Sequence, residues 1–315
     1  MERNKILLFF ILLFTLISTI LGLFTITSKS NKQSKIQTQK IMKEGVGAVL
    51  IRIEGEIHSG KSTYSSTGAD TVLSKIREVS EKPDIKGILL EINSPGGTVA
   101  ASQEIFEELL SLRKEKKIVV SMKDLAASGG YYIASAADYI YAEPGTITGS
   151  IGVITMSPDL TGLMEKMNVR MNVYKAGKYK DILSMFREAT SEEEGIINDL
   201  LSDTYKRFLS DISRGRNLAL NKVEKAAEGK IYSGERAIKM QLVDAIGGRK
   251  EALEKLSELC GQEGQLQLFE EEESPFDRML HLFNNKLTGI TNHLPMHSEI
   301  YKSPVLLVLP SALRF

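Results

Sequence analysis

The sequence predicts an α/β fold built on a mainly parallel sheet, and two observations carry this prediction. From Val46 onward, short apolar runs alternate with amphipathic segments. Two of the apolar runs, Ile85–Ile92 and Ile118–Met122, are nearly continuous, which is typical of strands buried on both faces of a sheet. Parallel strands need long crossover connections, and the amphipathic segments between the runs can supply them as helices.

Each element follows from its own periodicity. Apolar residues at helical spacing predict a helix over 69–79, and a second helix is expected over Val99–Leu112. A long helix is expected from about Ser191. The β-rich runs predict strands at Ala48–Glu54, Ile85–Ile92, Ile118–Met122, Ile140–Ala142, Ile151–Met156 and Val169–Tyr174.

Composition excludes several classes of protein. The 315 residues carry 40 Lys and Arg against 40 Asp and Glu, so no basic excess is present to neutralise nucleic-acid phosphates, and we expect no nucleic-acid partner. The single cysteine, Cys260, excludes internal disulfides and cysteine-based zinc sites. We expect no metal and no cofactor.

The first thirty residues differ from the rest. Ile6–Ile26 is a run without charged residues and would span about 32 Å as a helix, which is enough to cross a bilayer. Because no small-x-small cleavage site follows, we expect an uncleaved single-pass anchor over 1–27 rather than a signal peptide. A polar stalk over 28–44, a main domain over 45–260 and a tail over 261–315 complete the expected organisation. The amphipathic part of that tail, 276–287, is expected to be a peripheral helix.

One motif is rejected. Gly55 to Ser62 fits the pattern of a phosphate-binding P-loop, whose chemistry needs a helix beginning at the lysine, here Lys61. The polar, β-branched stretch from Ser62 to Gly68 predicts no helix there. A surface loop is the better interpretation.

Two glycine-rich turns follow buried strands, where open α/β sheets place their ligand sites. Asn93–Gly97 comes after the strand at Ile85–Ile92, and Ala126–Tyr132 follows the strand at Ile118–Met122. Backbone amides in such turns can stabilise an oxyanion. Ser128, within the second turn, is a candidate nucleophile. The residues alone favour a different role for this serine, that of a helix N-cap.

A serine nucleophile needs a base, and histidine is scarce. The four histidines are His58, in the rejected loop, and three in the tail: His281, His293 and His297. This shortage points to a lysine, which can act as a base once desolvation lowers its pKa. The residues leave Lys175, Lys178 and Lys180 open as candidates.

The ordered motifs closely resemble the signal peptide peptidase A (SppA) family, in its short single-domain form, over roughly residues 46–255. The motifs are Asn-Ser-Pro-Gly-Gly at 93–97, Ala-Ser-Gly-Gly-Tyr-Tyr at 127–132, Thr-Gly-Ser-Ile-Gly-Val at 148–153, Gly177-x-x-Lys180, Ile-Tyr-Ser-Gly at 231–234, Gln-Leu-Val-Asp at 241–244 and Gly-Gly at 247–248. The tail after about residue 260 has no counterpart in this resemblance.

The resemblance implies a Clp-protease/crotonase-like β/α superhelix behind the transmembrane helix. It implies that Ser128 is the nucleophile and Lys180 the general base, with Ser150 orienting the lysine. The amides of Gly97 and Gly129 would form the oxyanion hole. It further implies a ring-like homo-oligomer in which the serine and the lysine come from adjacent protomers.

We therefore expect a membrane-anchored Ser/Lys endopeptidase that degrades cleaved signal peptides and other membrane-associated peptides. Its catalytic domain is expected outside the cytoplasm, but the lysines that follow the anchor predict the opposite orientation under the positive-inside rule. The alternatives are a non-catalytic membrane scaffold on the same fold, an acyl-CoA-handling crotonase relative, and a P-loop nucleotidase using Gly60, Lys61 and Ser62.

Overall fold

The computed structural model describes residues 14–15, 18–19, 47–63, 65–270 and 306–308. The expected stalk over 28–44, most of the expected anchor over 1–27 and the amphipathic stretch at 276–287 lie outside these residues. Within the described part of the chain, no helix is both long enough and apolar enough to cross a membrane.

The chain divides into two units. The smaller unit comprises 1–47 and 267–297, and its described part includes strand β9 (Gln267–Phe269). The larger unit, 48–266 with 298–315, carries almost all described elements and every candidate site residue.

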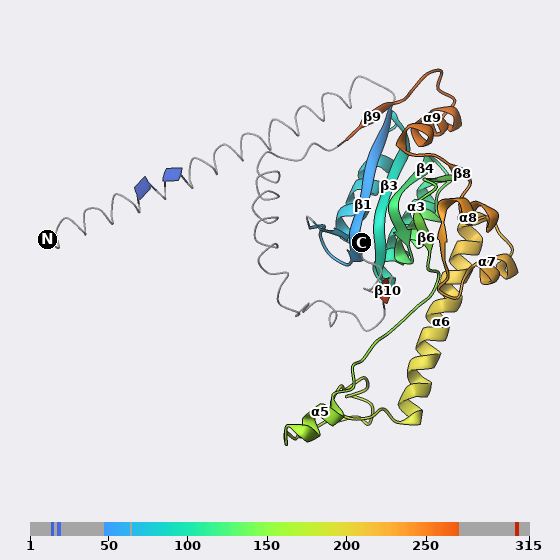
Figure 1. The fold of residues 1–315 in the computed structure, drawn as a ribbon. Coiled ribbons are helices and arrows are strands. Elements are labelled where there is room, and N and C mark those ends of the chain that lie inside the picture. Colours follow the sequence, from blue (N-terminus) through green and yellow to red (C-terminus); the bar gives the residue numbers. More distant parts are fainter. Residues whose placement is uncertain (1–13, 16–17, 20–46, 64, 271–305, 309–315) are drawn as a thin grey trace. The chain divides into compact units, whose positions relative to one another are not determined.

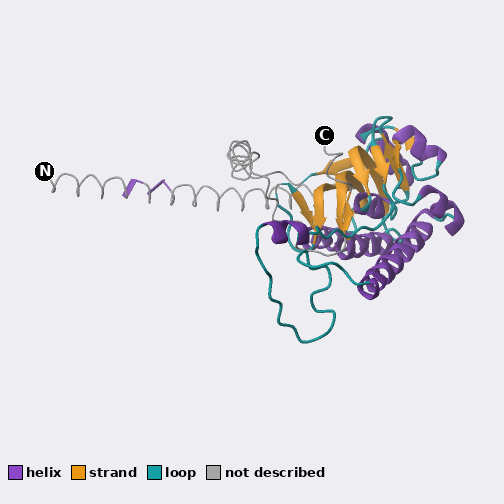
Figure 2. Cartoon of the chain, turned by 60° about the horizontal axis from the view of Figure 1, so that its bottom comes forward, coloured by secondary structure: helices purple, strands orange, loops and turns teal. Residues whose placement is uncertain are grey.

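A mixed, largely parallel sheet forms the centre of the larger unit (Figures 1 and 2). Its main strands run in the order β2-β1-β3-β4-β5-β8. The parallel pairs are β1 with β2, β3 with β4, β4 with β5, and β5 with β8. The bounds are β1 Gly47–His58, β2 Ser66–Gly68, β3 Ile85–Thr98, β4 Lys117–Ala127, β5 Tyr139–Ala142 and β8 Ala245–Ile246.

Helices cover both faces of this sheet. The helices that follow the early strands are α2 (Ala69–Ser80), α3 (Val99–Leu112) and α4 (Gly129–Ala134), whereas α9 (Arg249–Leu259) comes near the end of the larger unit. On β3, Gly87 faces Leu256 of α9, and Ile92 faces Gly130 of α4. Because side chains alternate along a strand, these contacts lie on opposite faces, which explains why β3 is buried without interruption from Gly87 to Ile92.

Smaller strands extend the edge of the sheet beside α4. Strand β6 (Ile147–Gly149) pairs parallel with the end of β4 and antiparallel with β7 (Ile231–Ser233). Strand β10 (Leu306–Val308) pairs antiparallel with Gly96–Thr98 of β3. The sheet is thus mixed at its periphery, while the predicted parallel pairing holds in its centre.

The long helix α6 (Ser191–Arg216) is fixed to the core at its C-terminal half only. There, Phe208 stacks on Tyr132 of α4 with ring centroids 4.4 Å apart. The Tyr132 hydroxyl also donates to Asp211, which Arg207 and Arg214 neutralise. The two short helices that come after it are α7 (Leu220–Ala226) and α8 (Gly234–Lys239).

Residues 155–190, here called the excursion, leave the sheet and end at the start of α6, which then leads the chain back to the core (Figure 1). Within it, only α5 (Thr161–Lys166) is regular. The predicted strands at Ile151–Met156, which overlaps its start, and Val169–Tyr174 are wrong: the first contains a single bridge residue, and the second is irregular and exposed. The apolar residues of Val169–Tyr174 are exposed and find no core to pack against within one chain, which explains the absence of a strand there. In Ile151–Met156, Ile151 is buried, and the residues after it become progressively more exposed as the chain leaves the sheet.

Candidate active site

The segment Asn93–Gly97, expected as a turn after the strand, is the last part of β3 itself, and it is held by the side chain of Ser94 and by a close approach to β1. Ser94 donates to the carbonyl of Gly55 at 2.6 Å and accepts from the amide of Gly96 at 3.1 Å. A methyl group added to Gly97 would lie 1.9 Å from the carbonyl oxygen of Ile57. Only glycine fits at position 97, because any side chain there would collide with the backbone of β1.

The turn at the end of β4 brings a second glycine against the first. A methyl group on Gly129 would lie 3.1 Å from the amide nitrogen of Gly97 and 2.5 Å from the hydroxyl of Ser102. Ser102 is fully buried and donates to the carbonyl of Thr98, so its side chain cannot easily move aside for a methyl group at position 129. The backbones of the two predicted oxyanion-hole glycines therefore converge.

Ser128 stands immediately before α4 in a strained backbone conformation, with φ 53° and ψ −115°. Such a conformation costs a non-glycine residue about 1–3 kcal/mol and often marks a functional site. Its amide donates to the carbonyl of Gly149 at 2.8 Å. Its side chain makes no capping hydrogen bond, so the N-cap role that the residues alone favour is wrong. The hydroxyl is left available for another partner.

Ser150 lies beside Ser128. Ala127 and Gly149 are register partners at the ends of the parallel strands β4 and β6. Each serine is the residue that directly follows one of these partners. Ser150 also has a left-handed backbone, with φ 52°, and its amide donates to the carbonyl of Lys230 at 2.7 Å. The structure thus brings together Ser128, Ser150 and the two glycines.

The three candidate lysines lie in the excursion and differ in their contacts. Lys175 forms an ion pair with Asp181, and Lys178 forms one with Glu192, which raises the pKa of Lys178. Lys180 is exposed and makes no ion pair or side-chain hydrogen bond with any described residue. Of the three, its amino group alone is not already neutralised by a described carboxylate.

The structure does not bring Lys180 to Ser128 within one chain. The excursion is tied to the start of α6 at Ser191, while α6 meets α4 at Phe208. At 1.5 Å per residue, about 26 Å of helix separates these two points. The same separation is visible in Figure 1, where the excursion lies at the end of α6 remote from the sheet.

The remaining sequence candidates stay outside this site. His58 contacts Ser66 and the carbonyl of Ser59 in its own loop. No helix begins at Lys61, since the following helix starts at Ala69, so the geometry of a P-loop is missing. The histidines of the tail, 281, 293 and 297, lie outside the described residues.

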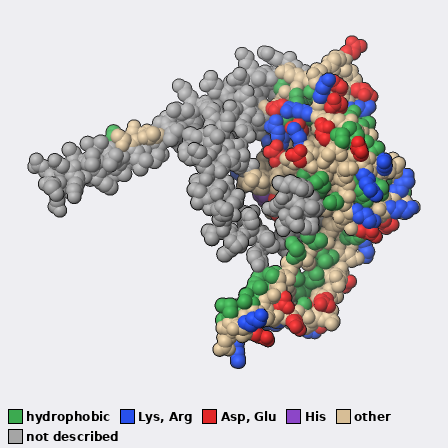
Figure 3. Space-filling model, in the orientation of Figure 1, with side chains coloured by type: hydrophobic (Ala, Val, Ile, Leu, Met, Phe, Trp, Pro, Cys, Tyr) green, Lys and Arg blue, Asp and Glu red, His purple; other side chains and the backbone are tan. Residues whose placement is uncertain are grey.

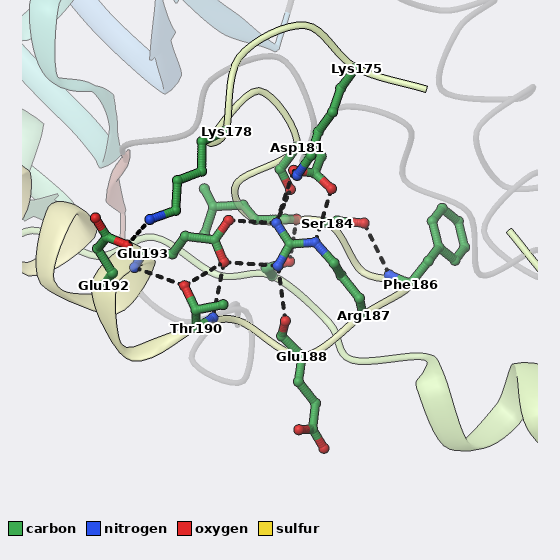
Figure 4. Close-up of polar contacts among 12 residues, drawn as sticks. Lys175, Lys178, Asp181, Ser184, Phe186, Arg187, Glu188, Thr190, Glu192 and Glu193 are labelled. Atoms are coloured by element: carbon green, nitrogen blue, oxygen red, sulfur yellow. Dashed lines mark hydrogen bonds and ion pairs between the residues drawn. The ribbon is translucent and has the colours of Figure 1, made fainter. Parts of the chain in front are cut away.

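Sequence reasoning missed a cluster of charges around Arg187 in the excursion, where Arg187 pairs with Glu193 and with Asp181, the residue that follows Lys180 in the sequence (Figure 4). One signal was readable: Thr190 and Glu193 have the spacing of a capping box, and the structure contains that box. The pairing of Arg187 with Asp181 and Glu193 could not be read from spacing alone.

Two family profiles match this chain. That of peptidase family S49 covers residues 111–263, and that of Clp protease covers 46–146. Together these two matches span the six main strands of the sheet, the converging glycines and the excursion.

Individual relatives agree with these profiles. A putative protease of Synechocystis sp. is 42% identical over 67% of this chain and 73% of its own length. A putative signal peptide peptidase SppA of Enterococcus faecium is 37% identical over 70% of this chain and 66% of its length. Protease 4 of Haemophilus influenzae is 36% identical over 68% of this chain, which spans only 35% of that longer protein.

The contact at Gly97 gives a test of the site's architecture. We expect Gly97→Ala to lower the free energy of unfolding by about 2–3 kcal/mol, because the added methyl group collides with β1. Gly145→Ala is the matched control, since nothing lies within 4 Å of its added methyl group. Urea denaturation of the full chain measures both. Equal stability of the two variants would contradict the close approach.

Proposed function

The chain belongs to peptidase family S49, and we propose that it is a membrane-anchored serine endopeptidase with Ser128 as nucleophile and Lys180 as general base. The strongest support is the site around Ser128. This serine has a strained backbone, its side chain makes no capping hydrogen bond, and two glycine backbones converge beside it. Strain of this kind persists only where the surrounding structure enforces it. A serine serving only as a cap would need neither feature.

The proposed reaction follows from these parts. Neutral Lys180 accepts the Ser128 proton as the hydroxyl oxygen attacks the peptide carbonyl carbon. The amides of Gly97 and Gly129 donate to the resulting oxyanion. The lysine then gives its proton to the leaving amine, which leaves an acyl-enzyme ester. Water, deprotonated by the same lysine, hydrolyses that ester and restores Ser128, while Ser150 keeps the amino group oriented.

We propose that the lysine comes from a neighbouring protomer in a ring-like homo-oligomer. The separation along α6 supports this, since one chain's excursion is remote from its own Ser128. The excursion also exposes apolar side chains that a second copy could cover (Figure 3): Met156, Leu163, Met167, Val169, Met171, Val173 and Tyr174. Large exposed apolar patches commonly mark interaction surfaces.

We further propose that the substrates are cleaved signal peptides and other membrane-associated peptides, met by a catalytic domain anchored through 1–27. The printed name of the Enterococcus relative, a putative signal peptide peptidase, supports this substrate class. The edge of β3 supports a position for the substrate backbone, because Gly96–Thr98 already pairs with one extended segment, β10. A substrate strand lying antiparallel there would bring its carbonyl beside Gly97.

The first experiment is hydrolysis of an apolar reporter peptide by the full chain in detergent micelles, from pH 6 to 10. We expect activity to rise with pH as a lysine base loses its proton. Ser128→Ala and Lys180→Ala should each lower kcat by at least about 1,000-fold. Lys178→Ala is the control: Glu192 holds the pKa of Lys178 above its usual value, so this lysine stays protonated over the range. Activity that survives the Ser128 or Lys180 change refutes the dyad, and an assembled but inactive wild type favours the scaffold.

Mixing tests the shared site. Oligomers assembled from Ser128→Ala and Lys180→Ala chains should regain part of the wild-type activity, because some sites then combine an intact serine with an intact lysine. Peptide hydrolysis after co-expression with two affinity tags measures this recovery. No recovery in doubly purified mixed oligomers would contradict a dyad formed between protomers.

Truncation tests the substrate pose. Since β10 occupies the edge of β3 beside Gly97, a chain ending at Lys302 should show a lower KM for the reporter peptide. A chain ending at Pro310, which keeps β10, is the matched control and should behave as wild type. An unchanged KM after the shorter truncation would argue against binding of substrate along this edge.

A further inference from the structure

Arg187 lies between two carboxylates and binds both in a forked arrangement (Figure 4). Its Nε and one terminal nitrogen donate to the Asp181 carboxylate, each at 2.9 Å. Its other terminal nitrogen donates to Glu193 at 2.8 Å, and a second short contact joins the same two side chains. Paired hydrogen bonds of this kind fix direction as well as distance.

Glu193 is the fixed end of this arrangement. Its side chain is only 4% exposed and belongs to the first turn of α6. It accepts from the amide of Thr190 at 2.9 Å and completes the capping box of the helix. Hydrogen bonds from Arg187 lower the pKa of Glu193 to about 2, so the carboxylate stays charged throughout the working range of the proposed enzyme.

Asp181 is the other end, and it is the residue next to Lys180. Its side chain is 14% exposed, and its carboxylate also accepts from Lys175. Hydrogen bonds from Arg187 and Lys175 hold the pKa of Asp181 well below its usual range. The backbone around it is a series of turns, in which the carbonyl of Asp181 accepts from the amide of Ser184 at 3.0 Å.

The side chain of Lys180 has no comparable support. It is exposed and has no side-chain partner among the described residues, so its position depends on the backbone that carries it. That backbone is attached to α6 on both sides of Lys180. After it, Asp181 is joined through Arg187 to Glu193. Before it, the Tyr179 hydroxyl donates to Glu192. A catalytic group displaced by about 1 Å can lose roughly 100-fold in rate, so the attachment matters for the proposed reaction.

We propose that Arg187 is a positioning residue, which clamps the turn carrying Lys180 onto the start of α6 so that the amino group is presented to Ser128 of a neighbouring protomer. This inference rests on the proposed function. Arginine suits the role because its planar guanidinium can grip two carboxylates at once. A lysine at position 187 could satisfy only part of this geometry.

Arg187→Ala in the full chain, assembled in detergent micelles, tests the clamp. We expect kcat to fall about 10- to 100-fold while KM stays within about twofold, because Gly97 and the edge of β3 are untouched. Arg187→Lys should recover only part of the loss. Lys178→Ala is the matched control, since it removes an exposed ion pair to α6 from the same turn and should leave kcat near wild type. Wild-type kcat in Arg187→Ala, or an equal loss in the control, would overturn the proposal.

Mixed oligomers separate positioning from a general structural role. Arg187→Ala chains should regain activity when mixed with Ser128→Ala chains, which supply an intact excursion, and should not when mixed with Lys180→Ala chains. Recovery with both partners, or with neither, would overturn the assignment. The Ser128→Ala and Lys180→Ala mixture serves as the reference, because its failure would count against the proposed shared dyad rather than against Arg187.

A second variant covers the case in which Arg187→Ala does not assemble. Asp181→Asn removes the charge next to Lys180 and leaves the contacts between Arg187, Glu193 and Thr190 in place. The same selective fall in kcat and the same pattern of recovery are expected. An assembled Asp181→Asn chain with wild-type kcat would refute the clamp.

Discussion

The close approach of backbones at Gly97 is the constraint on which the rest of the candidate site depends. The end of β3 can touch β1 at Ile57 and α4 at Gly129 only because neither glycine carries a side chain. Once these contacts are made, the chain that enters α4 has little freedom, and Ser128 takes a backbone conformation that a serine would otherwise avoid. Burial of α4 in the core, where Tyr132 and its neighbours are fully packed, offsets the free-energy cost of this strained conformation.

The remainder of the larger unit divides into the packed core around the sheet and the projecting excursion, and α6 joins them. Its C-terminal part is fixed by Phe208 and Asp211 against α4, next to the serine. Its N-terminal part holds the excursion through Glu193. Helix α6 therefore sets the separation between Ser128 and the excursion that carries Lys180 within one chain. A helix is suited to this purpose, because its regular backbone hydrogen bonds fix the rise at about 1.5 Å per residue.

Local pattern predicted the parts of the fold whose environment lies within one chain. The helix at Val99–Leu112 and the strand beginning at Ile85 appear where apolar periodicity indicated them, because their partners are parts of the same core. Periodicity failed at Val169–Tyr174, where alternating apolar residues face solvent in the described structure. Alternation reports that a segment has an apolar face, but it cannot say whether that face is covered by the same chain.

In the candidate site, too, the residues packed within one chain were easier to predict than those in the exposed excursion. Gly97 lies at the end of β3 and Ser128 directly after β4, and the rule that ligand sites gather at the carboxyl ends of parallel strands was enough to suspect them. For Lys180, residue type alone left three candidates, and the contacts of Lys175 and Lys178 now set those two apart. Arg187 was not suspected, because a bidentate clamp depends on a chain reversal that spacing does not reveal.

An exposed lysine far from its serine has a physical consequence under the proposed mechanism. A lysine becomes a base near neutral pH only when its surroundings exclude water, and the excursion of a single chain provides no such cover for Lys180. The same contact between protomers that brings the amino group to Ser128 would also bury it. Assembly would then supply proximity and desolvation in one step, and an isolated chain would carry every catalytic side chain yet remain inactive. For a peptidase, the proposed arrangement would restrict hydrolysis to the assembled oligomer.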